Sequence, residues 1–329
     1  MQDPFANAGR GSRKPHVASL ELAELARLRD DILLLAADLG RGPLGAAFIA
    51  AHPERFHDFG IAEANSLSVA AGLAACGFKP YVIAMSCFSA MKCAEQIRND
   101  LAFPMMPVRI LSSLPGLALA YFGTSHHAVE DIAIARSITN LTLVAPSDAQ
   151  TTRALLRSTI DDPGPVYFRL MQGSEADLYP EPPAIERGRF LRLREGRHLT
   201  MIATGLGTQI AAGAAEMLAR DGVEAAILDA VYLKPFDEAA VVAAARATGH
   251  ILCIEEHGVI GGLGSAVAEV LARHALPVRI LLHGLPDTDL EVSTPAELYE
   301  LYGLTPQGVA AKARELVGAP AGEGHVHRG

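Results

Sequence analysis

The segment FGIAEANSLSVAAGLAACGFKPYVIAM, residues 59–85, predicts a helix of small residues followed by a buried strand. Apolar and small residues at helical spacing begin near Ala62, and Gly77 suits the left-handed residue that closes a helix. The run PYVIAM that follows is short, apolar and rich in residues that favour strands. A helix that leads directly into an apolar strand is typical of a sheet covered by helices on both faces.

The same alternation of helix and strand continues on both sides of this segment. Upstream, apolar residues at helical spacing from Leu20 lead into the buried run ILLLA, residues 32–36. Downstream, helical stretches separate the apolar runs VRILSS (108–113), LTLVAP (141–146) and VYFRL (166–170). This pattern predicts an α/β fold with doubly wound, mostly parallel sheets, whose site lies at the carboxyl ends of the strands.

A break in the periodicity divides the chain in two. Around YPEPPAIERGR, residues 179–189, prolines and charges replace the apolar pattern, and a second alternating unit begins beyond it. At 329 residues the chain exceeds the usual size of one domain, so two domains of about 150 residues are expected. The predicted organisation is a disordered arm (1–15), a first domain (16–175), a linker (176–197), a second domain (198–318) and a flexible tail (319–329).

Charge and composition argue against several kinds of partner. The net charge is −9 and Lys and Arg do not cluster, which argues against nucleic acid or an acidic membrane surface as a partner. The first fifteen residues lack the apolar run of a signal peptide. Four cysteines lie in mostly apolar stretches without CxxC spacing, so we expect reduced, buried thiols in a cytoplasmic protein.

Three motifs contain residues that could carry chemistry. Glu63 is predicted at the start of a helix, where a carboxylate either complements the helix dipole or serves a reaction. The loop FGTSHHAVED, residues 122–131, has adjacent histidines that could pass protons or bind hydroxyl or phosphate groups, or could be ordinary surface residues. The turn HGVIGGLGS, residues 257–265, resembles a phosphate-binding turn but lacks a P-loop lysine, which favours close packing or a subunit contact.

Several longer segments resemble the transketolase family in order and spacing. Those similar to its pyrimidine-binding domain are FGIAEANSLSVAAGLAACGFKPYV, AEQIRNDLAFPMMPVRIL and GTSHHAVEDIAIARSITNLTLVAPSDAQ. Those similar to its C-terminal domain are IATG, LKPFD, EEHGVIGGLGSAVAE and STPAELYELYGL. The likeness runs from about Leu20 to Val317, and it extends to 1-deoxyxylulose-5-phosphate synthase and to the β subunits of 2-oxo acid dehydrogenases.

The resemblance implies thiamine diphosphate as the cofactor. In this family the glutamate of the G-I-A-E motif contacts N1′ of the aminopyrimidine, and Glu63 is the matching residue. A carboxyl group at N1′ favours the imino form, whose 4′-nitrogen can take the proton from the thiazolium carbon C2. Phe88 matches an aromatic residue that stacks on the pyrimidine, with an alignment offset of one residue, and Ile61 is assigned to the same pocket.

The resemblance also implies contacts with the substrate. His126 matches a histidine that faces the substrate and takes part in catalysis, and Arg169 matches an arginine that holds the phosphate of phosphosugars. Arg41 is likewise expected to contact the substrate. Phe122 and Leu114 stand where relatives carry polar groups, so we expect apolar surface there and an acceptor with few hydroxyls.

The diphosphate domain of the family has no counterpart in the sequence. In relatives that domain holds Mg²⁺ and diphosphate through a GDG motif, and this sequence contains no GDG. We therefore expect no metal ligands in this chain. A separate N-terminal transketolase-like subunit would supply the GDG motif, in an α2β2 heterotetramer that acts on small molecules.

Three functions are compatible with these motifs. The S-H-H loop and the EQIRND helix favour a transketolase-like subunit that transfers a two-carbon ketol unit between sugar phosphates or related acceptors. The first alternative is the β subunit of a 2-oxo acid dehydrogenase or another acyl-transferring enzyme. The second is a noncatalytic scaffold, against which Glu63, His126 and Arg169 argue.

Overall fold

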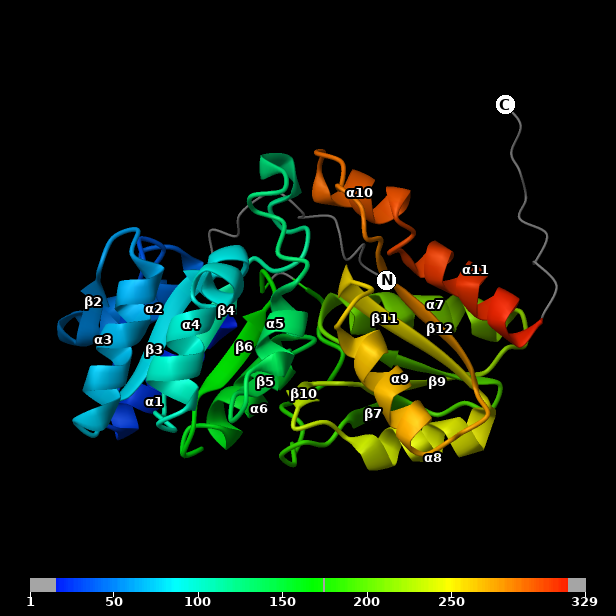
Figure 1. The fold of residues 1–329 in the computed structure, drawn as a ribbon, viewed down its shortest axis with the longest axis horizontal. Helices are drawn as coiled ribbons and strands as arrows, with labels where there is room; N and C mark the ends of the chain where they lie inside the picture. The colour runs from blue at the N-terminus through cyan, green and yellow to red at the C-terminus, as the bar shows by residue number, and fades with distance from the viewer. Residues whose placement is uncertain (1–15, 174, 319–329) are drawn as a thin grey trace.

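Two α/β domains lie side by side in the computed structural model, which describes residues 16–173 and 175–318 (Figure 1). The predicted arm, 1–15, and tail, 319–329, fall outside these residues. Within the described ranges, no helix combines the length and the apolar character needed to cross a membrane.

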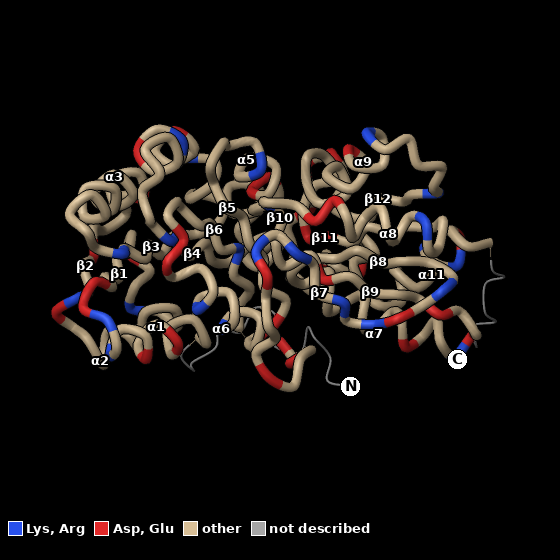
Figure 2. The backbone as a smooth tube through the Cα atoms, turned by 90° about the horizontal axis from the view of Figure 1, so that it is seen from below, with Lys and Arg blue, Asp and Glu red and all other residues tan. Residues whose placement is uncertain are grey.

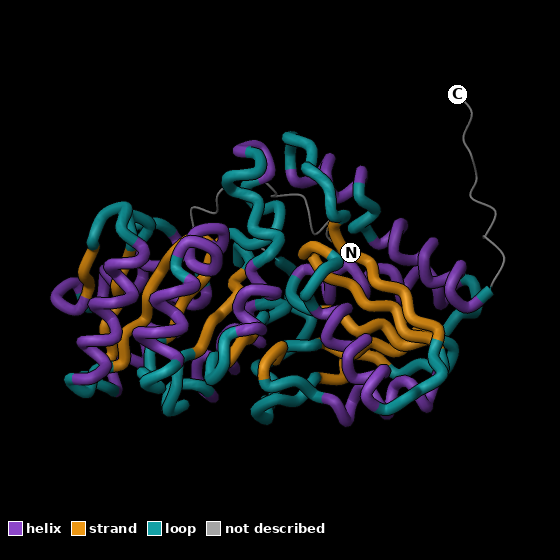
Figure 3. Tube along the Cα trace, in the orientation of Figure 1, coloured by secondary structure: helices purple, strands orange, loops and turns teal. Residues whose placement is uncertain are grey.

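The alternation predicted from the sequence is confirmed in both domains (Figure 3). The first domain contains α1 (Val17–Leu28), β1 (Ile32–Ala36), α2 (Pro43–Ala51), η1 (Pro53–Arg55), β2 (Phe56–Asp58), α3 (Glu63–Ala75), β3 (Lys79–Met85), η2 (Phe88–Lys92), α4 (Ala94–Gln96), η3 (Ile97–Ala102), β4 (Arg109–Ser113), η4 (Ala120–Phe122), α5 (Asp131–Ser137), β5 (Thr142–Val144), α6 (Ala149–Ser158) and β6 (Val166–Leu170). The second part of the chain contains β7 (Leu191–Arg194), β8 (Leu199–Ala203), α7 (Leu206–Arg220), β9 (Ala225–Asp229), β10 (Tyr232–Lys234), α8 (Glu238–Thr248), β11 (His250–Gly258), α9 (Leu263–Arg273), β12 (Arg279–Leu285), α10 (Pro295–Leu301) and α11 (Pro306–Val317).

The first sheet has the strand order β10-β5-β6-β4-β3-β1-β2. All its pairings are parallel except that of β10 with β5. Every residue of β1, β4 and β6 is buried, as expected for strands covered on both faces. Helices α1, α2 and α6 cover one face, and α3 and α5 cover the other (Figure 2).

The second sheet has the order β12-β11-β8-β9-β7, with β7 antiparallel to β9. Strand β10 follows β9 in the chain but pairs with β5 of the first sheet, so the part predicted as the second domain contributes a strand to the first. Figure 2 shows Lys and Arg scattered among Asp and Glu along the backbone.

The segment after β3 differs from the regular helix expected at about residues 91–101. It consists of two π-helical stretches, η2 and η3, separated by the short α4. A π-helical turn accommodates one extra residue in a helix, and Phe88 is the first residue of such a stretch. The expectation of buried thiols holds for Cys93 and Cys253, whereas Cys76 is exposed and Cys87 is half-buried.

The glycine-rich turn at residues 257–265 serves close packing. The backbone N–H groups of Leu263 and Gly264 donate to the Glu255 carboxylate at 2.7 and 2.8 Å. A Cβ at Gly262 would lie 2.0 Å from Glu255 Oε2. A carboxylate of the chain itself therefore occupies the start of α9, where a phosphate would otherwise bind.

A buried carboxyl group joins both domains and the linker. Asp229, the last residue of β9, is fully buried and accepts hydrogen bonds from Ser147, from Thr208 Oγ1 at 2.9 Å and from the Tyr179 hydroxyl at 3.1 Å. Burial raises the pKa of Asp229 to about 7, although the three hydroxyl groups oppose the shift.

Asp229→Asn is expected to flatten the pH dependence of stability. The folded pKa lies above the unfolded value of 3.8, so the stabilisation is complete below about pH 4 and is lost as pH rises through about 7. A neutral Asn removes this contribution to the pH dependence, which changes the free energy of unfolding by at most about 1.4 kcal/mol per pH unit. Urea denaturation at a series of pH values measures how the free energy of unfolding depends on pH. The variant Asp289→Asn, at an exposed position, is the control. An unchanged slope in Asp229→Asn would contradict the assignment.

Candidate functional site

The predicted site residues lie at the carboxyl edge of the first sheet. Glu63 follows β2, Phe88 follows β3, and the loop of residues 114–127 follows β4. This edge is where ligands bind in open sheets of this kind. Arg41 is exposed in the loop between β1 and α2, at the same edge.

Glu63 is the first residue of α3 and is almost completely buried, with 4% of its surface exposed. Its Oε2 accepts a hydrogen bond from Lys92 Nζ at 2.8 Å. The Lys92 side chain is half exposed, and the neighbouring carboxylate raises the pKa of Lys92. A buried carboxylate is therefore held by a cation that can move away into solvent.

Aromatic rings connect three of the predicted residues, Phe88, Phe122 and His126. The ring centroids of Phe88 and His126 are 5.4 Å apart in a T-shaped arrangement, and those of Phe122 and His126 are 4.7 Å apart. Lys92 Nζ lies 6.0 Å from the centroid of Phe88. The contacts of Lys92 thus bring Glu63 and the ring cluster into one site.

The two adjacent histidines have different roles. His127 is buried, and its Nε2 donates to the carbonyl of Ala120 at 3.0 Å, which fixes the loop. His126 is half-buried, belongs to the ring cluster and has Nδ1 2.9 Å from Ser125 Oγ. His127 nevertheless lines a cavity beside Phe88, whereas His126 is not among the residues that line it.

A cavity and an exposed apolar rim accompany these residues. The cavity has a volume of about 270 Å³, and Phe88, Met91 and Lys92 are among the residues that line it. The rim consists of large apolar side chains that are exposed by 76% for Ile61, 57% for Met91, 56% for Phe122 and 47% for Tyr121. Of these four, Met91 lines the cavity and Phe122 packs against His126. An apolar surface left exposed in this way marks a place where a ligand or another protein binds. Of the three residues predicted to meet the pyrimidine, Phe88 lines this cavity, whereas Glu63 and Ile61 do not. Their contact with the pyrimidine stays a prediction.

The structure does not support the phosphate contact predicted for Arg169. This side chain is 2% exposed, and its Nε donates to Asp131 Oδ2 at 2.8 Å. One terminal nitrogen donates to the carbonyl of Glu256 at 2.7 Å, and the Glu256 carboxylate lies 3.9 Å from the guanidinium. Two buried carboxylates already neutralise Arg169, so a phosphate would have to enter a space closed to solvent.

Sequence reasoning missed Lys92 and the carboxylates around Arg169. Lys92 stands four residues after Phe88, a spacing that places two helical side chains on one face and could have indicated it. Nothing in the local sequence connects Arg169 with Glu256, because the two residues are 87 positions apart. Across residues 16–173 and 175–318, no three His, Cys, Asp or Glu side chains are placed to hold a metal ion.

Comparison with known proteins supports the resemblance noted in the sequence. Residues 16–174 match the family model of the transketolase pyrimidine-binding domain, and residues 188–309 match that of the transketolase C-terminal domain. An apulose-4-phosphate transketolase subunit of Phocaeicola vulgatus is 36% identical over 90% of this chain and 95% of its own length. The 6-deoxy-6-sulfo-D-fructose transketolase subunit SqwH of Clostridium sp. (strain MSTE9) is 36% identical over 90% of this chain and 91% of its own.

A solved structure extends the comparison to the whole fold. It is a split-gene transketolase in an inactive β4 tetramer, with a TM-score of 0.83 and 37% sequence identity. The superposition covers 93% of this chain and 98% of that one.

Proposed function

Because this chain belongs to the transketolase family, we propose that it is one subunit of a split enzyme that uses thiamine diphosphate. The enzyme transfers a two-carbon ketol unit from a ketose to a carbonyl acceptor. This proposal rests on one observation: Glu63, Phe88, Phe122 and His126 meet at the carboxyl edge of one sheet, beside apolar side chains left exposed.

The residues of this chain would hold the pyrimidine half of the cofactor. Thiamine diphosphate supplies, when bound, a thiazolium carbon that can attack a carbonyl group. Glu63 would hold a proton at the N1′ atom of the pyrimidine, and its burial at a helix start suits a carboxyl group that shares a proton. Phe88 and Ile61 would offer apolar surface to the ring. Lys92 would have to leave Glu63, and its exposure makes that movement easy.

The loop after β4 would meet the substrate. His126 would donate or accept a hydrogen bond at a substrate oxygen, because its ring is only half-buried and faces Phe88. Phe122 would cover the substrate, and Arg41 would approach any charged group from the exposed loop after β1. Arg169 is left out of this site because its charge is already paired.

The other half of the site would come from a second subunit. Mg²⁺ and the diphosphate would bind to a subunit with the GDG motif. Two relatives support such a division. One is named as a subunit of an apulose-4-phosphate transketolase, and the other is a split-gene transketolase. The exposed rim of Ile61, Met91 and Phe122 would then be covered in an α2β2 assembly. We place the complex in the cytoplasm, where free cysteines stay reduced.

Mixing experiments test this proposal. The purified chain alone is expected to bind thiamine diphosphate poorly and to transfer nothing, whereas addition of the GDG-bearing subunit restores both. Calorimetry with the cofactor and Mg²⁺ measures binding, and a coupled assay measures transfer from a ketose phosphate to an aldehyde. The GDG-bearing subunit alone is the control. Micromolar binding together with turnover by the isolated chain would contradict the split site.

A further inference from the structure

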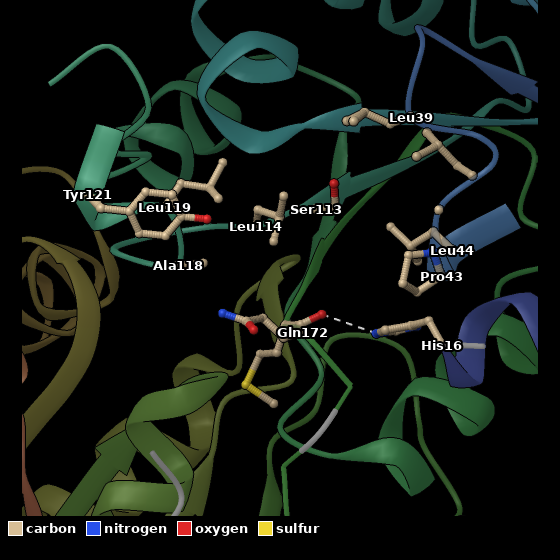
Figure 4. A pocket seen from close by; sticks show the side chains of 13 residues that line it. His16, Leu39, Pro43, Leu44, Ser113, Leu114, Ala118, Leu119, Tyr121 and Gln172 are labelled. Atoms are coloured by element: carbon tan, nitrogen blue, oxygen red, sulfur yellow. Dashed lines mark hydrogen bonds between the residues drawn. The ribbon is translucent and has the colours of Figure 1, made fainter. Parts of the chain in front are cut away.

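A second cavity, of about 260 Å³, lies at the same edge of the first sheet, where β1, β3 and β4 end, and Figure 4 shows the side chains that line it. Its walls are largely apolar and include Leu39, Leu44, Leu114, Leu119 and Tyr121. It exceeds the roughly 150 Å³ of an apolar cavity known to hold benzene. The described residues that line it include no Lys, Arg, Asp or Glu.

The polar groups in this cavity are neutral and mostly committed to the protein. His16 Nδ1 accepts from the N–H of Ala18 at 3.0 Å, and its Nε2 donates to the carbonyl of Met171 at 3.1 Å (Figure 4). Burial lowers the pKa of His16 to about 4, so the ring is uncharged near neutral pH. Ser113 donates to the carbonyl of Ala84 at 3.2 Å, and Gln172 adds a neutral amide. Among the described residues that line this cavity, a phosphate dianion would find none of the charged donors that it needs, and the exposed Arg41 stands outside this lining.

The topology of the sheet places this cavity at a ligand-binding position. From β1 the chain runs through α2 to β2 on one side, while β3 pairs with β1 on the other side, so the strand order reverses between β1 and β3. Leu39 after β1 and Ile83 near the end of β3 both line the cavity. Such a reversal is the usual position of a ligand in open α/β sheets.

The backbone at Leu114 provides independent support. This residue has a φ of +55°, a conformation that a branched, bulky side chain rarely adopts. Residues held in such conformations cluster at ligand-binding sites. Here the strain holds an apolar side chain against the cavity.

A continuous series of rings connects this cavity with the proposed catalytic site. Tyr121 lines the cavity, and its ring centroid lies 4.7 Å from that of Phe122. Phe122 lies 4.7 Å from His126, which in turn lies 5.4 Å from Phe88. Tyr121 and Phe122 thus place this cavity beside the ring cluster that contains His126.

We propose that this cavity is the acceptor subsite, and that it takes the uncharged, apolar tail of an aldehyde rather than a sugar phosphate. This inference rests on the proposed function, because an acceptor subsite is needed only if the enzyme transfers a two-carbon unit to an acceptor. The side chains of Leu114, Leu119 and Tyr121, which line the cavity, would then select the class of acceptor. The product ketose carries the same tail and would leave from the same subsite.

Acceptor profiling with the reconstituted complex tests the subsite. With β-hydroxypyruvate as donor, whose leaving group is carbon dioxide and carries no phosphate into the subsite, kcat/KM is expected to rise about fourfold for each methylene from propanal to pentanal. Pentanal should also exceed ribose 5-phosphate. A flat series, or the highest efficiency with ribose 5-phosphate, would overturn the apolar subsite while leaving two-carbon transfer intact.

Leu114→Asn is the matched variant, because Asn adopts positive φ readily and is close to Leu in size. It is expected to lower kcat/KM for pentanal about tenfold to a hundredfold and to change that for glycolaldehyde little. Leu28→Asn, at an exposed position 83% accessible in the same domain, is the control and should leave the preference unchanged. Equal loss with both aldehydes would mean that Leu114 serves only the fold.

A binding measurement separates failure of the subsite from failure of the proposed function. If no aldehyde accepts a two-carbon unit, the transferase proposal fails, and the cavity is then examined by saturation-transfer NMR with 1-hexanol. Binding that Leu114→Asn abolishes and Leu28→Asn retains would support the apolar subsite. Absence of binding to the unmodified complex would overturn it.

Discussion

Glu63→Gln in the reconstituted complex is expected to slow hydrogen–deuterium exchange at C2 of thiamine diphosphate by several orders of magnitude. A neutral amide cannot share the N1′ proton as a carboxyl group does. The substitution keeps the size of a side chain that is 4% exposed, so packing at the start of α3 is preserved. The ion pair with Lys92 is lost, but Lys92 is half exposed and regains water.

The unfolding midpoint and a variant at an exposed glutamate provide the controls for this experiment. The unfolding midpoint of Glu63→Gln should stay close to that of the unmodified chain, and Glu95→Gln, at an exposed position on α4, should exchange normally. NMR of the bound cofactor follows the C2 proton directly. An unchanged exchange rate in Glu63→Gln would remove Glu63 from the proposed role.

Arg169→Ala is expected to lower the free energy of unfolding by about 3–5 kcal/mol. Burial opposes the charge of Arg169, but the carboxylates of Asp131 and Glu256 outweigh it and raise the pKa of Arg169. Removing the guanidinium leaves these two carboxylates buried without a cation. The damage should reach the substrate loop, because Glu256 Oε1 also accepts from the N–H of Leu117 at 2.9 Å.

Chemical denaturation distinguishes this structural role from the phosphate contact predicted from the sequence. Arg27→Ala removes an exposed pair with Glu24 and should cost no more than about 1 kcal/mol. Combining Arg169→Met with Asp131→Asn should recover part of the lost stability, because one uncompensated charge disappears. Near-normal stability of Arg169→Ala, together with a raised KM for phosphorylated substrates alone, would instead favour a phosphate contact.

Local patterns in the sequence were sufficient for the alternation of helices and strands, but not for the pairing of β10 with the first sheet. The fully apolar run ILLLA predicted a strand buried on both faces, and β1 is such a strand. The stretch from Ala62 to Gly77 predicted a helix, and α3 covers Glu63–Ala75. Both signals arise within a few residues of one another, because hydrophobic periodicity and helix-closing glycines act over one or two turns. The same locality put Glu63 at a helix start before any relative was considered.

The pairing of charges and the lining of the cavities were decided only by the tertiary structure. Arg169 lies 38 positions from Asp131 and 87 from Glu256. The contact with Asp131 depends on how α5 packs on the first sheet, and the contact with Glu256 depends on how the two domains pack. Likewise Leu39, Leu114 and Gln172 come from separate loops and line one cavity because parallel strands end at the same edge. The sequence by itself determined the residue types, the layered fold and the family of this protein. Which charges are already neutralised and which surfaces remain open follow from burial, and burial depends on contacts between residues far apart in the chain.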